Sequence, residues 1–218
     1  MRIIAQTFIA IVCLGPLMWV DPASAQRTYS LTVSRHPDVA ISEAKVDEIL
    51  AEASKVLQKN PGHVDTRDNV ACNVTFRRNG PVRTFASPTA PKIIDSPEER
   101  NAVHRENADV KVVQKINFCR GDPGEFAGCA WPPRAGRRLI SMIVVRNPPA
   151  GVRGAGILWA HEFGHRTGLR HRNEHLALMT ICDLRTDQVQ VRRRECDCFL
   201  SGPRTCTRRD PRHLQCDQ

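Results

Sequence analysis

His161, Glu162, His165 and His171 lie close together in the second half of the chain. On a helix, residues four positions apart lie one above the other on the same face. His161 and His165 could therefore offer two imidazole nitrogens to one metal ion. Glu162, one position further round, could reach a water on that ion without binding the ion itself. Three protein ligands and one open position are the requirement for a catalytic zinc, whereas structural zinc sites are closed by four protein ligands.

Gly168 explains how the third histidine could reach the same ion. Glycine readily adopts the left-handed backbone conformation that ends helices. We therefore expect the helix over Ile157–Thr167 to end at Gly168, so that the chain turns and His171 swings back toward the metal. This glycine and third histidine make the pattern far more specific than two histidines alone. Metal storage or scavenging is an alternative, but it would not need Glu162 as a general base.

Four strands are predicted upstream of the histidine helix, from alternation of polar and apolar residues or from enrichment in β-branched residues. These strands are Tyr29–Val33, Val70–Arg77, Val110–Phe118 and Leu139–Val145. Turn-forming residues predict a loop over Gly121–Gly136. Residues 147–156, rich in Pro and Gly, predict a flexible connector into the histidine helix.

Two further helices are predicted before the histidine helix. Ser42 is a natural N-cap, and apolar residues recur after it at three- and four-residue spacing until residues 60–62, Asn-Pro-Gly, stop the helix. Ser96 and Pro97 are typical of the start of a short helix, because proline fits the first helical position.

Residues 1–25 have the features of a signal peptide. Arg2 gives a positive start, an apolar stretch follows, and residues 23–25, Ala-Ser-Ala, form a small-residue cleavage site before Gln26. We expect export to a periplasm or out of the cell, with an uncleaved membrane anchor as the alternative. No other stretch is long and apolar enough to span a bilayer, so we expect no membrane attachment after cleavage.

The cysteines predict disulfides. The chain has nine cysteines, and eight remain if Cys13 leaves with the signal peptide. An even number in an exported chain favours disulfide bonds. Cys119 and Cys129 flank a loop and are plausible partners, whereas Cys196 and Cys198 are too close in sequence to pair with each other. If all pair internally, at least one bridge joins the groups before and after the histidines. A zinc knuckle in the tail is the alternative.

The net charge of +9 comes mostly from arginine. It could favour acidic partners or anionic surfaces, but a solvated surface is the simpler interpretation. The runs at 192–194 and 208–209 have no aromatic residues among them, which disfavours nucleic-acid binding. We expect a monomer whose partners are protein or peptide substrates.

The segment His161–His171 resembles the long zinc-binding consensus of the metzincin metalloproteases. That family also has a methionine in a turn beneath the metal, and Met179, in an Ala-Leu-Met sequence, is similarly placed. Its spacing resembles the matrixin (matrix-metalloprotease-like) branch. Three further segments are similar to matrixins: Ala108–Val110, Phe126–Pro132 and Leu184–Gln190, the last resembling the family's final helix with Thr186 as its cap.

The resemblance implies an α+β metzincin-like catalytic domain over residues 26–195. It would contain a twisted, mostly parallel sheet with two long helices, and a small lower subdomain with the Met-turn and a C-terminal helix. Residues 196–218 would form a cysteine-rich tail that staples the lower part. The resemblance would also allow structural Ca²⁺ or a second Zn²⁺ bound through His104 or His63. The upstream loops show no obvious acidic calcium loop, however, and the spacing of these histidines does not support a second zinc site.

The chain also departs from the matrixin pattern. Arg172 stands where matrixins usually have serine, and Thr180 and Ile181 replace the usual Tyr-Pro after the methionine. Cys182 follows this turn. We expect it in a disulfide, although a free thiolate there could act as an inhibitory ligand.

Together these features predict a secreted zinc-dependent endopeptidase. The catalytic Zn²⁺ would be held by His161, His165 and His171, with Gly168 and Met179 supporting the site. Glu162 would act as general base on a zinc-activated water and pass its proton to the leaving amine. Two alternatives stay open: a secreted zinc-binding, non-proteolytic binding or adhesion module, and a disulfide-rich binding protein without metal.

Overall fold

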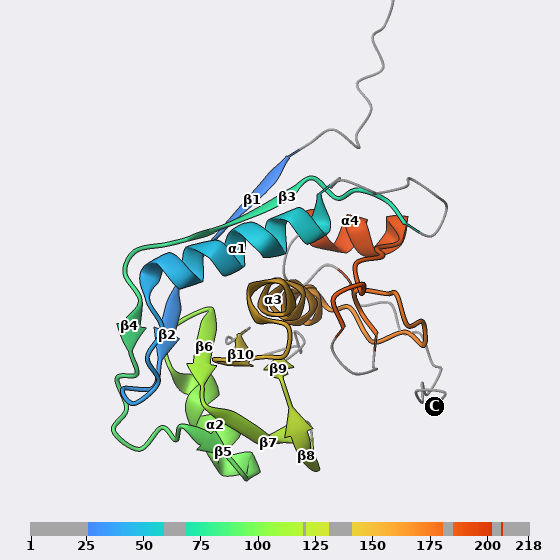
Figure 1. Cartoon of the computed structure of the whole chain (residues 1–218). Coiled ribbons are helices and arrows are strands. Elements are labelled where there is room, and N and C mark those ends of the chain that lie inside the picture. Colours follow the sequence, from blue (N-terminus) through green and yellow to red (C-terminus); the bar gives the residue numbers. More distant parts are fainter. Residues whose placement is uncertain are drawn as a thin grey trace, which may run out of the picture.

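The computed structural model of the 218-residue chain describes residues 26–58, 69–119, 121–130, 141–180, 185–201 and 206. The expected signal peptide, the helix stop at 60–62, Cys182 and most of the tail lie outside the described residues. Within the described residues, no helix has the length and apolar character needed to cross a membrane. The elements form a mixed α+β arrangement, as expected (Figure 1).

The central sheet of the described residues has five strands. Their order across the sheet is β4 (Arg83–Thr84), β2 (Val33–Arg35), β6 (Val110–Val113), β10 (Met142–Val145) and β9 (Gly128–Ala130). The first four strands pair in parallel, and β9 is antiparallel to β10. A separate pair joins β1 (Arg27–Leu31) in parallel to β3 (Val74–Arg78). The strand expected over Tyr29–Val33 is thus divided between two sheets.

Two expectations for the region after β6 are wrong. The single strand expected over Val110–Phe118 divides into β6 and β7 (Lys115–Cys119), because Val110 and Val112 pack in the main core while residues of β7 pack in a second core. The loop expected over Gly121–Gly136 contains β8 (Asp122–Phe126) and β9. Pairing of β8 with β7 overrides the low strand propensity of its Pro and Gly. The third sheet is completed by β5 (Ile93–Ile94), which pairs with β7.

Helices α1 (Glu43–Leu57) and α2 (Pro97–Arg105) begin where the sequence predicts. The Ser42 hydroxyl accepts a hydrogen bond from the Lys45 amide at 3.1 Å, and Ser96 caps α2 in the same way. The apolar side of α1 is buried by Val46, Ile49, Leu50, Ala53, Val56 and Leu57.

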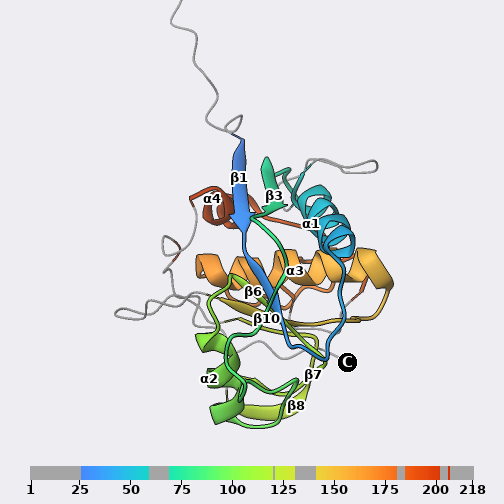
Figure 2. The same cartoon turned by 90° about the vertical axis from the view of Figure 1, so that its left-hand side faces the viewer.

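Helix α3 (Gly151–Thr167) lies across the molecule between α1 and the central sheet (Figure 2). It begins earlier than Ile157, so the connector expected over residues 147–156 is partly helical. The glycines there serve close packing. A Cβ on Gly156 would lie 2.9 Å from the Ala53 amide nitrogen of α1. These contacts bring the two helices together and fix the position of α3.

The last helix of the described residues, α4 (Arg193–Ser201), begins later than expected. Thr186 and Asp187 form a turn instead, and Gln190 pairs with the segment after the third histidine. Gln190 donates its N–H to the Leu176 carbonyl, and its own carbonyl accepts from the Leu178 N–H, both at 2.9 Å. The expected final helix over Leu184–Gln190 is therefore wrong for the described part of that range.

Three disulfides join described cysteines. Cys119–Cys129, predicted from the sequence, has its Cα atoms 5.9 Å apart. Cys72–Cys196 joins the cysteines before and after the histidines, and Cys198–Cys206 joins α4 to the tail, with Cα separations of 5.3 and 5.5 Å. The alternative of a tail zinc knuckle is wrong for these cysteines, because their sulfurs are already bonded. α4 spans residue 195, the expected boundary between the catalytic domain and the tail. The disulfide from Cys196 to Cys72 connects α4 to the segment just before β3.

Lys111 is an unusual core residue, because its side chain is 0% exposed on β6. Its ammonium donates a hydrogen bond to the Ala108 carbonyl at 2.5 Å. Burial, reinforced by the charge of Arg166, lowers the pKa of Lys111 to about 7. The unfolded chain would keep this proton up to the ordinary lysine pKa of 10.5. The folded protein must therefore either hold a poorly hydrated ammonium or release its proton at neutral pH.

Lys111→Met should stabilise the protein at neutral pH. A lysine whose folded-state pKa is lowered destabilises most below that pKa, and the penalty disappears as pH rises toward the unfolded-state value. We expect the free energy of unfolding to rise by about 1–4 kcal/mol at about pH 7. The difference from wild type should shrink as the pH approaches 10. Urea unfolding of both proteins across this range would measure it, and a variant less stable than wild type at neutral pH would contradict it.

Candidate metal and catalytic site

The last turns of α3 carry His161, Glu162 and His165, and the helix ends at Gly168, as the sequence predicts. Gly168 has a φ of 101°, in the left-handed region. Leu169 then donates its N–H to the Gly164 carbonyl at 3.0 Å. A Cβ on Gly168 would also run into the Cys206 carbonyl oxygen. This turn sends the chain back toward the helix and brings the third histidine to the first two.

The three histidines meet through one ring nitrogen each. Nε2 of His171 lies 3.1 Å from Nε2 of His161 and 2.9 Å from Nε2 of His165. Within the described part of the chain, these residues are the one group of three or more metal-ligating side chains close enough to share an ion.

The other ring nitrogens show which atoms are available to a metal. Nδ1 of His161 lies 2.7 Å from the Leu178 carbonyl oxygen, and Nδ1 of His165 lies 2.9 Å from that of Leu169. A carbonyl only accepts hydrogen bonds, so both Nδ1 atoms carry the proton and both Nε2 atoms present lone pairs. Two lone pairs therefore face His171, whose neutral ring has only one N–H to donate. Such a cluster of nitrogen lone pairs fits a metal cation.

Glu162 is buried beside this cluster, with 4% of its surface exposed. Its side chain packs directly against the backbone of Gly128 in β9. A Cβ on Gly128 would lie 2.7 Å from both Cγ and Cδ of Glu162, and closer still to Oε1. Only glycine leaves room for the carboxyl group at this point. Sequence reasoning missed Gly128, because nothing local shows which helix a strand glycine faces.

Met179 is fully buried against α3 on the side of Gly164. A Cβ on Gly164 would overlap the Met179 sulfur, so the glycine allows this close contact. The neighbouring Leu178 carbonyl holds His161, and the Met179 carbonyl accepts the Arg172 N–H at 2.8 Å. The segment around Met179 therefore contacts both α3 and the loop that carries His171.

Arg166, next to His165, ties the end of α3 to the central sheet. Its guanidinium donates to the Asp109 carboxylate at 2.8 Å, and Asp109 also accepts from the amide and hydroxyl of Thr32. Burial raises the pKa of Asp109, but the Arg166 charge and the Thr32 hydrogen bonds outweigh burial and hold that pKa below its ordinary value. Asp109 therefore stays ionised and fixes the orientation of the helix end.

A cleft of about 860 Å³ opens over these residues. Its walls include all three histidines and Glu162 on one side, β9 on another, and Thr180 close to the buried methionine. This volume is in the range of enzyme and ligand sites. β9 is the last strand of the sheet beyond β10 among the described residues, and its residues Gly128–Ala130 line the cleft.

His104 is not part of this site. It is buried, with Nδ1 2.8 Å from the Ser141 hydroxyl, and it belongs to no group of three potential ligands among the described residues. His63, the other histidine considered for a second zinc, lies outside the described residues.

No protein family or curated protein matches the chain. Among solved structures, archaemetzincin from Methanopyrus kandleri is similar over 82% of this chain and 96% of that chain, with 14% identity and a TM-score of 0.46. Metalloproteinase-II from Bacteroides fragilis is similar over 81% of this chain and 54% of that chain, with 15% identity and a TM-score of 0.43. At such low identities and TM-scores, these likenesses do not define the chemistry of the site, which we infer from its own residues.

Proposed function

We propose that this chain is an exported zinc-dependent endopeptidase of the metzincin type. One observation carries the proposal: Nε2 atoms of His161, His165 and His171 converge beside the buried carboxyl group of Glu162, at an open cleft. Storage of a metal would need the nitrogens alone. A carboxyl group next to them, facing a cleft large enough for a substrate, supports hydrolysis.

The histidines would bind zinc through Nε2, each in an orientation fixed in advance. The carbonyls of Leu178 and Leu169 hold the rings of His161 and His165 through Nδ1, which keeps Nε2 unprotonated. When bound, zinc would supply a Lewis acid that lowers the pKa of a water molecule and polarises a carbonyl oxygen. Met179 would form an apolar floor beneath the histidines without binding the metal.

Glu162 would move the proton. Its carboxylate takes a proton from the attacking water as the new bond to the carbonyl carbon forms. It then gives that proton to the departing amine nitrogen as the C–N bond breaks. The backbone of Gly128 confines the carboxyl group on one side, so it has little freedom to turn away from the cleft.

The substrate would be an extended peptide. β9 lines the cleft at the end of the described sheet, and its outer backbone groups would pair with a peptide strand, which would lay the peptide along the cleft beside Glu162. Residues after Met179 would form the wall beyond the scissile bond, beginning with Thr180. The position of Met179 supports a matrixin-like arrangement of this part, with Arg172 as the main departure.

Three disulfides among the described cysteines suit an oxidising compartment. Together with the expected signal peptide over residues 1–25, they support a secreted or periplasmic location. We propose that the mature chain acts there as a monomer.

Removal of zinc should abolish hydrolysis, and zinc should restore it. We would strip the protein with a chelator and add zinc back while following cleavage of an unfolded protein substrate. The rate should rise in proportion to added zinc and level off at about one ion per chain. Calcium or magnesium should not replace it, because imidazole nitrogens suit zinc better. Zinc binding without cleavage would favour a non-proteolytic binding module, and a chain that binds no zinc would favour the metal-free alternative.

A further inference from the structure

Arg172 immediately follows the third histidine and stands where the chain departs from the matrixin pattern. Its side chain is only 12% exposed. Its N–H donates to the Met179 carbonyl at 2.8 Å, and Arg172 and Thr180 form a parallel β-bridge. The backbone of Arg172 therefore joins the loop that carries His171 to the segment Met179–Thr180.

The Arg172 guanidinium makes contacts in three directions. Nη1 lies 2.6 Å from the Glu174 carboxylate, Nη2 donates to the Gln190 carbonyl at 2.9 Å, and Nε lies 3.2 Å from the Glu195 carboxylate. A planar guanidinium with donors on several sides suits such an arrangement, whereas a lysine ammonium presents a single point charge. One side chain thus fastens the histidine loop to two later segments of the chain.

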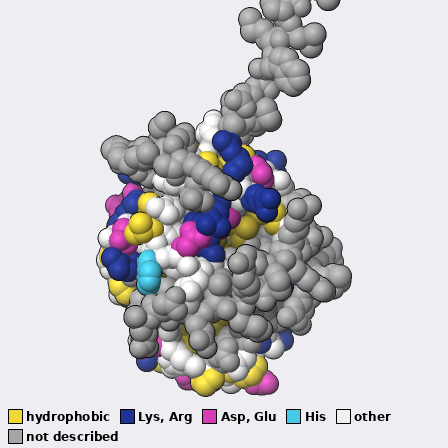
Figure 3. Space-filling model, turned by 90° about the vertical axis from the view of Figure 1, so that its right-hand side faces the viewer, with side chains coloured by type: hydrophobic (Ala, Val, Ile, Leu, Met, Phe, Trp, Pro, Cys, Tyr) yellow, Lys and Arg dark blue, Asp and Glu magenta, His cyan; other side chains and the backbone are white. Residues whose placement is uncertain are grey.

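A second arginine, Arg192, contacts the same two carboxylates as Arg172. Arg192 lies 2.5 Å from the other oxygen of the Glu174 carboxylate, and its amide donates to the second oxygen of Glu195 at 2.8 Å. Arg172, Glu174, Arg192 and Glu195 together form what we call the Arg172 network. Figure 3, which views the right-hand side of Figure 1, shows Lys and Arg side chains next to Asp and Glu.

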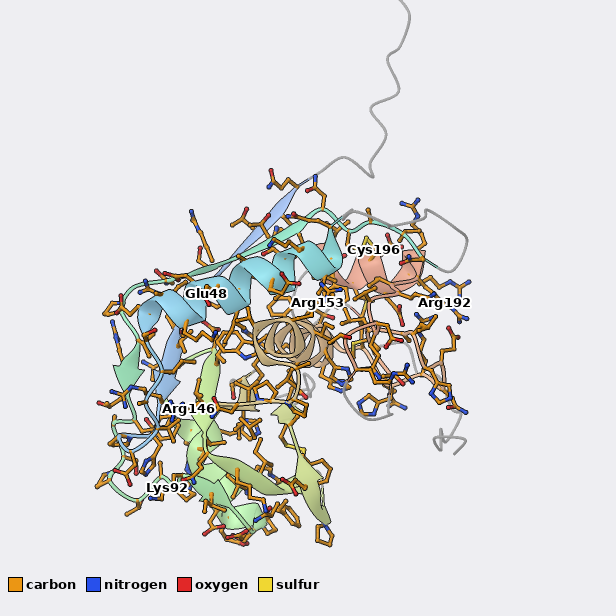
Figure 4. All side chains as sticks on the ribbon, viewed as in Figure 1. Glu48, Lys92, Arg146, Arg153, Arg192 and Cys196 are labelled. Atoms are coloured by element: carbon orange, nitrogen blue, oxygen red, sulfur yellow. A yellow bond between two sulfur atoms is a disulfide. The ribbon has the colours of Figure 1, made fainter. Side chains whose placement is uncertain are left out.

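The Arg172 network ends on a firmly attached helix. Glu195 belongs to α4, and the next residue, Cys196, is bonded to Cys72 ahead of β3. The carbonyl of Phe199 in α4 also accepts a hydrogen bond from the Tyr29 hydroxyl at 2.6 Å. Figure 4 labels Arg192 just before α4 and Cys196 within it. The loop of His171 is therefore anchored to the body of the protein through α4.

We propose that Arg172 is a positioning residue for His171, which holds the third imidazole in its metal-binding position by fastening its loop to α4. This inference rests on the zinc site of the proposed function. His161 and His165 are fixed by their helix, whereas His171 lies on a loop and needs another support. If that support is removed, zinc binding must order the loop, and its affinity falls accordingly.

The test compares zinc affinity and the Co²⁺ absorption spectrum of wild type, Arg172→Met and Arg172→Lys. We expect Arg172→Met to bind zinc about 10–100-fold more weakly, the size of effect seen when support of a metal ligand is lost. Its Co²⁺ ligand-field bands should change, which general destabilisation with an intact site would not cause. The zinc affinity of Arg172→Lys should lie between those of wild type and Arg172→Met, because lysine keeps the positive charge but loses the planar guanidinium with its several donors.

Arg185→Met is the matched control. It removes the same charge in the same part of the chain, where the Arg185 side chain is 60% exposed and pairs with Asp187 at 3.0 Å. Its zinc affinity and Co²⁺ spectrum should equal those of wild type. Should Arg172→Met fail to fold, Glu195→Gln supplies the second variant, and weaker zinc binding than wild type is expected there too.

Two outcomes separate this inference from the function it rests on. Arg172→Met and Glu195→Gln with wild-type zinc affinity and an unchanged Co²⁺ spectrum would overturn the positioning role. A wild-type chain that binds no zinc would instead overturn the proposed function. The double variant Arg172→Met, Glu195→Gln should bind zinc no more weakly than Arg172→Met alone, because both changes break the same connection.

Discussion

Replacing Glu162 by alanine should greatly slow peptide hydrolysis while zinc stays bound. The carboxylate is the one acidic group among the described residues that is buried beside the three histidines, and the alanine variant has no group there to accept the proton of water. General acid–base catalysis of this kind contributes about 10²–10⁴-fold to a rate. We therefore expect the initial rate of cleavage to fall by that factor. Elemental analysis should still find about one zinc per chain, because no histidine is changed.

Glu125→Ala is the control for this substitution. Glu125 lines the same cleft, but its side chain is 78% exposed and pairs with Lys115 at 3.9 Å on the surface. An exposed ion pair contributes little, so we expect nearly the wild-type rate. If Glu162→Ala cleaves as fast as Glu125→Ala, then Glu162 is not the general base.

Gly128→Ala should lower the rate almost as strongly without changing the metal ligands. The added Cβ would stand 2.7 Å from Cγ and Cδ of Glu162, so the carboxyl group must move. A displacement of about 1 Å in a catalytic group can reduce the rate about 10²-fold. We expect kcat to fall by this order while zinc affinity stays at the wild-type value. Steady-state kinetics and a zinc competition titration on the same samples would measure both.

The double variant Gly128→Ala, Glu162→Ala shows whether the glycine acts through the glutamate. If it does, Gly128→Ala causes no further loss once Glu162 has been replaced. An equal further loss in that background would mean that the methyl group damages substrate binding along β9 instead. Weaker zinc binding by Gly128→Ala would also contradict the explanation.

Local signals in the sequence predicted the parts of the site that local geometry controls. The four-residue spacing of His161 and His165 requires only a helix, and Gly168 ends that helix with the left-handed conformation expected. Ser42 likewise marks the start of α1, because its cap bond is made within one turn. In each of these cases the partners are a few residues apart in the sequence.

The parts that depend on distant partners were not predictable in the same way. Gly128 is needed because the Glu162 side chain of α3 packs on it, and the sequence of β9 does not indicate that contact. Arg172 looks like a surface charge until α4 brings Glu195 to it. The Cys72–Cys196 pair could not be singled out, since eight cysteines allow 105 connectivities.

The wrong prediction of a single strand over Val110–Phe118 also arises from contacts with residues distant in sequence. Val110–Phe118 is a continuous run with high strand propensity, but Val110 and Val112 pack in the main core, whereas Val113 and Ile116 pack in the second core. The division falls at Gln114, where the amide donates to the Lys92 carbonyl at 2.8 Å, and Lys92 is distant in sequence. The pattern of apolar residues thus predicted the presence of strand and not its break, because the break depends on tertiary packing.

The most direct measurement adds zinc to metal-free wild type and metal-free Glu162→Ala side by side and follows zinc bound and peptide cleaved in the same samples. We predict that both proteins bind about one zinc per chain, and that cleavage appears only in wild type, in proportion to the zinc bound. Cleavage by metal-free wild type, or equal cleavage by the two zinc-loaded proteins, would contradict a site in which three histidines hold the metal and Glu162 moves the proton.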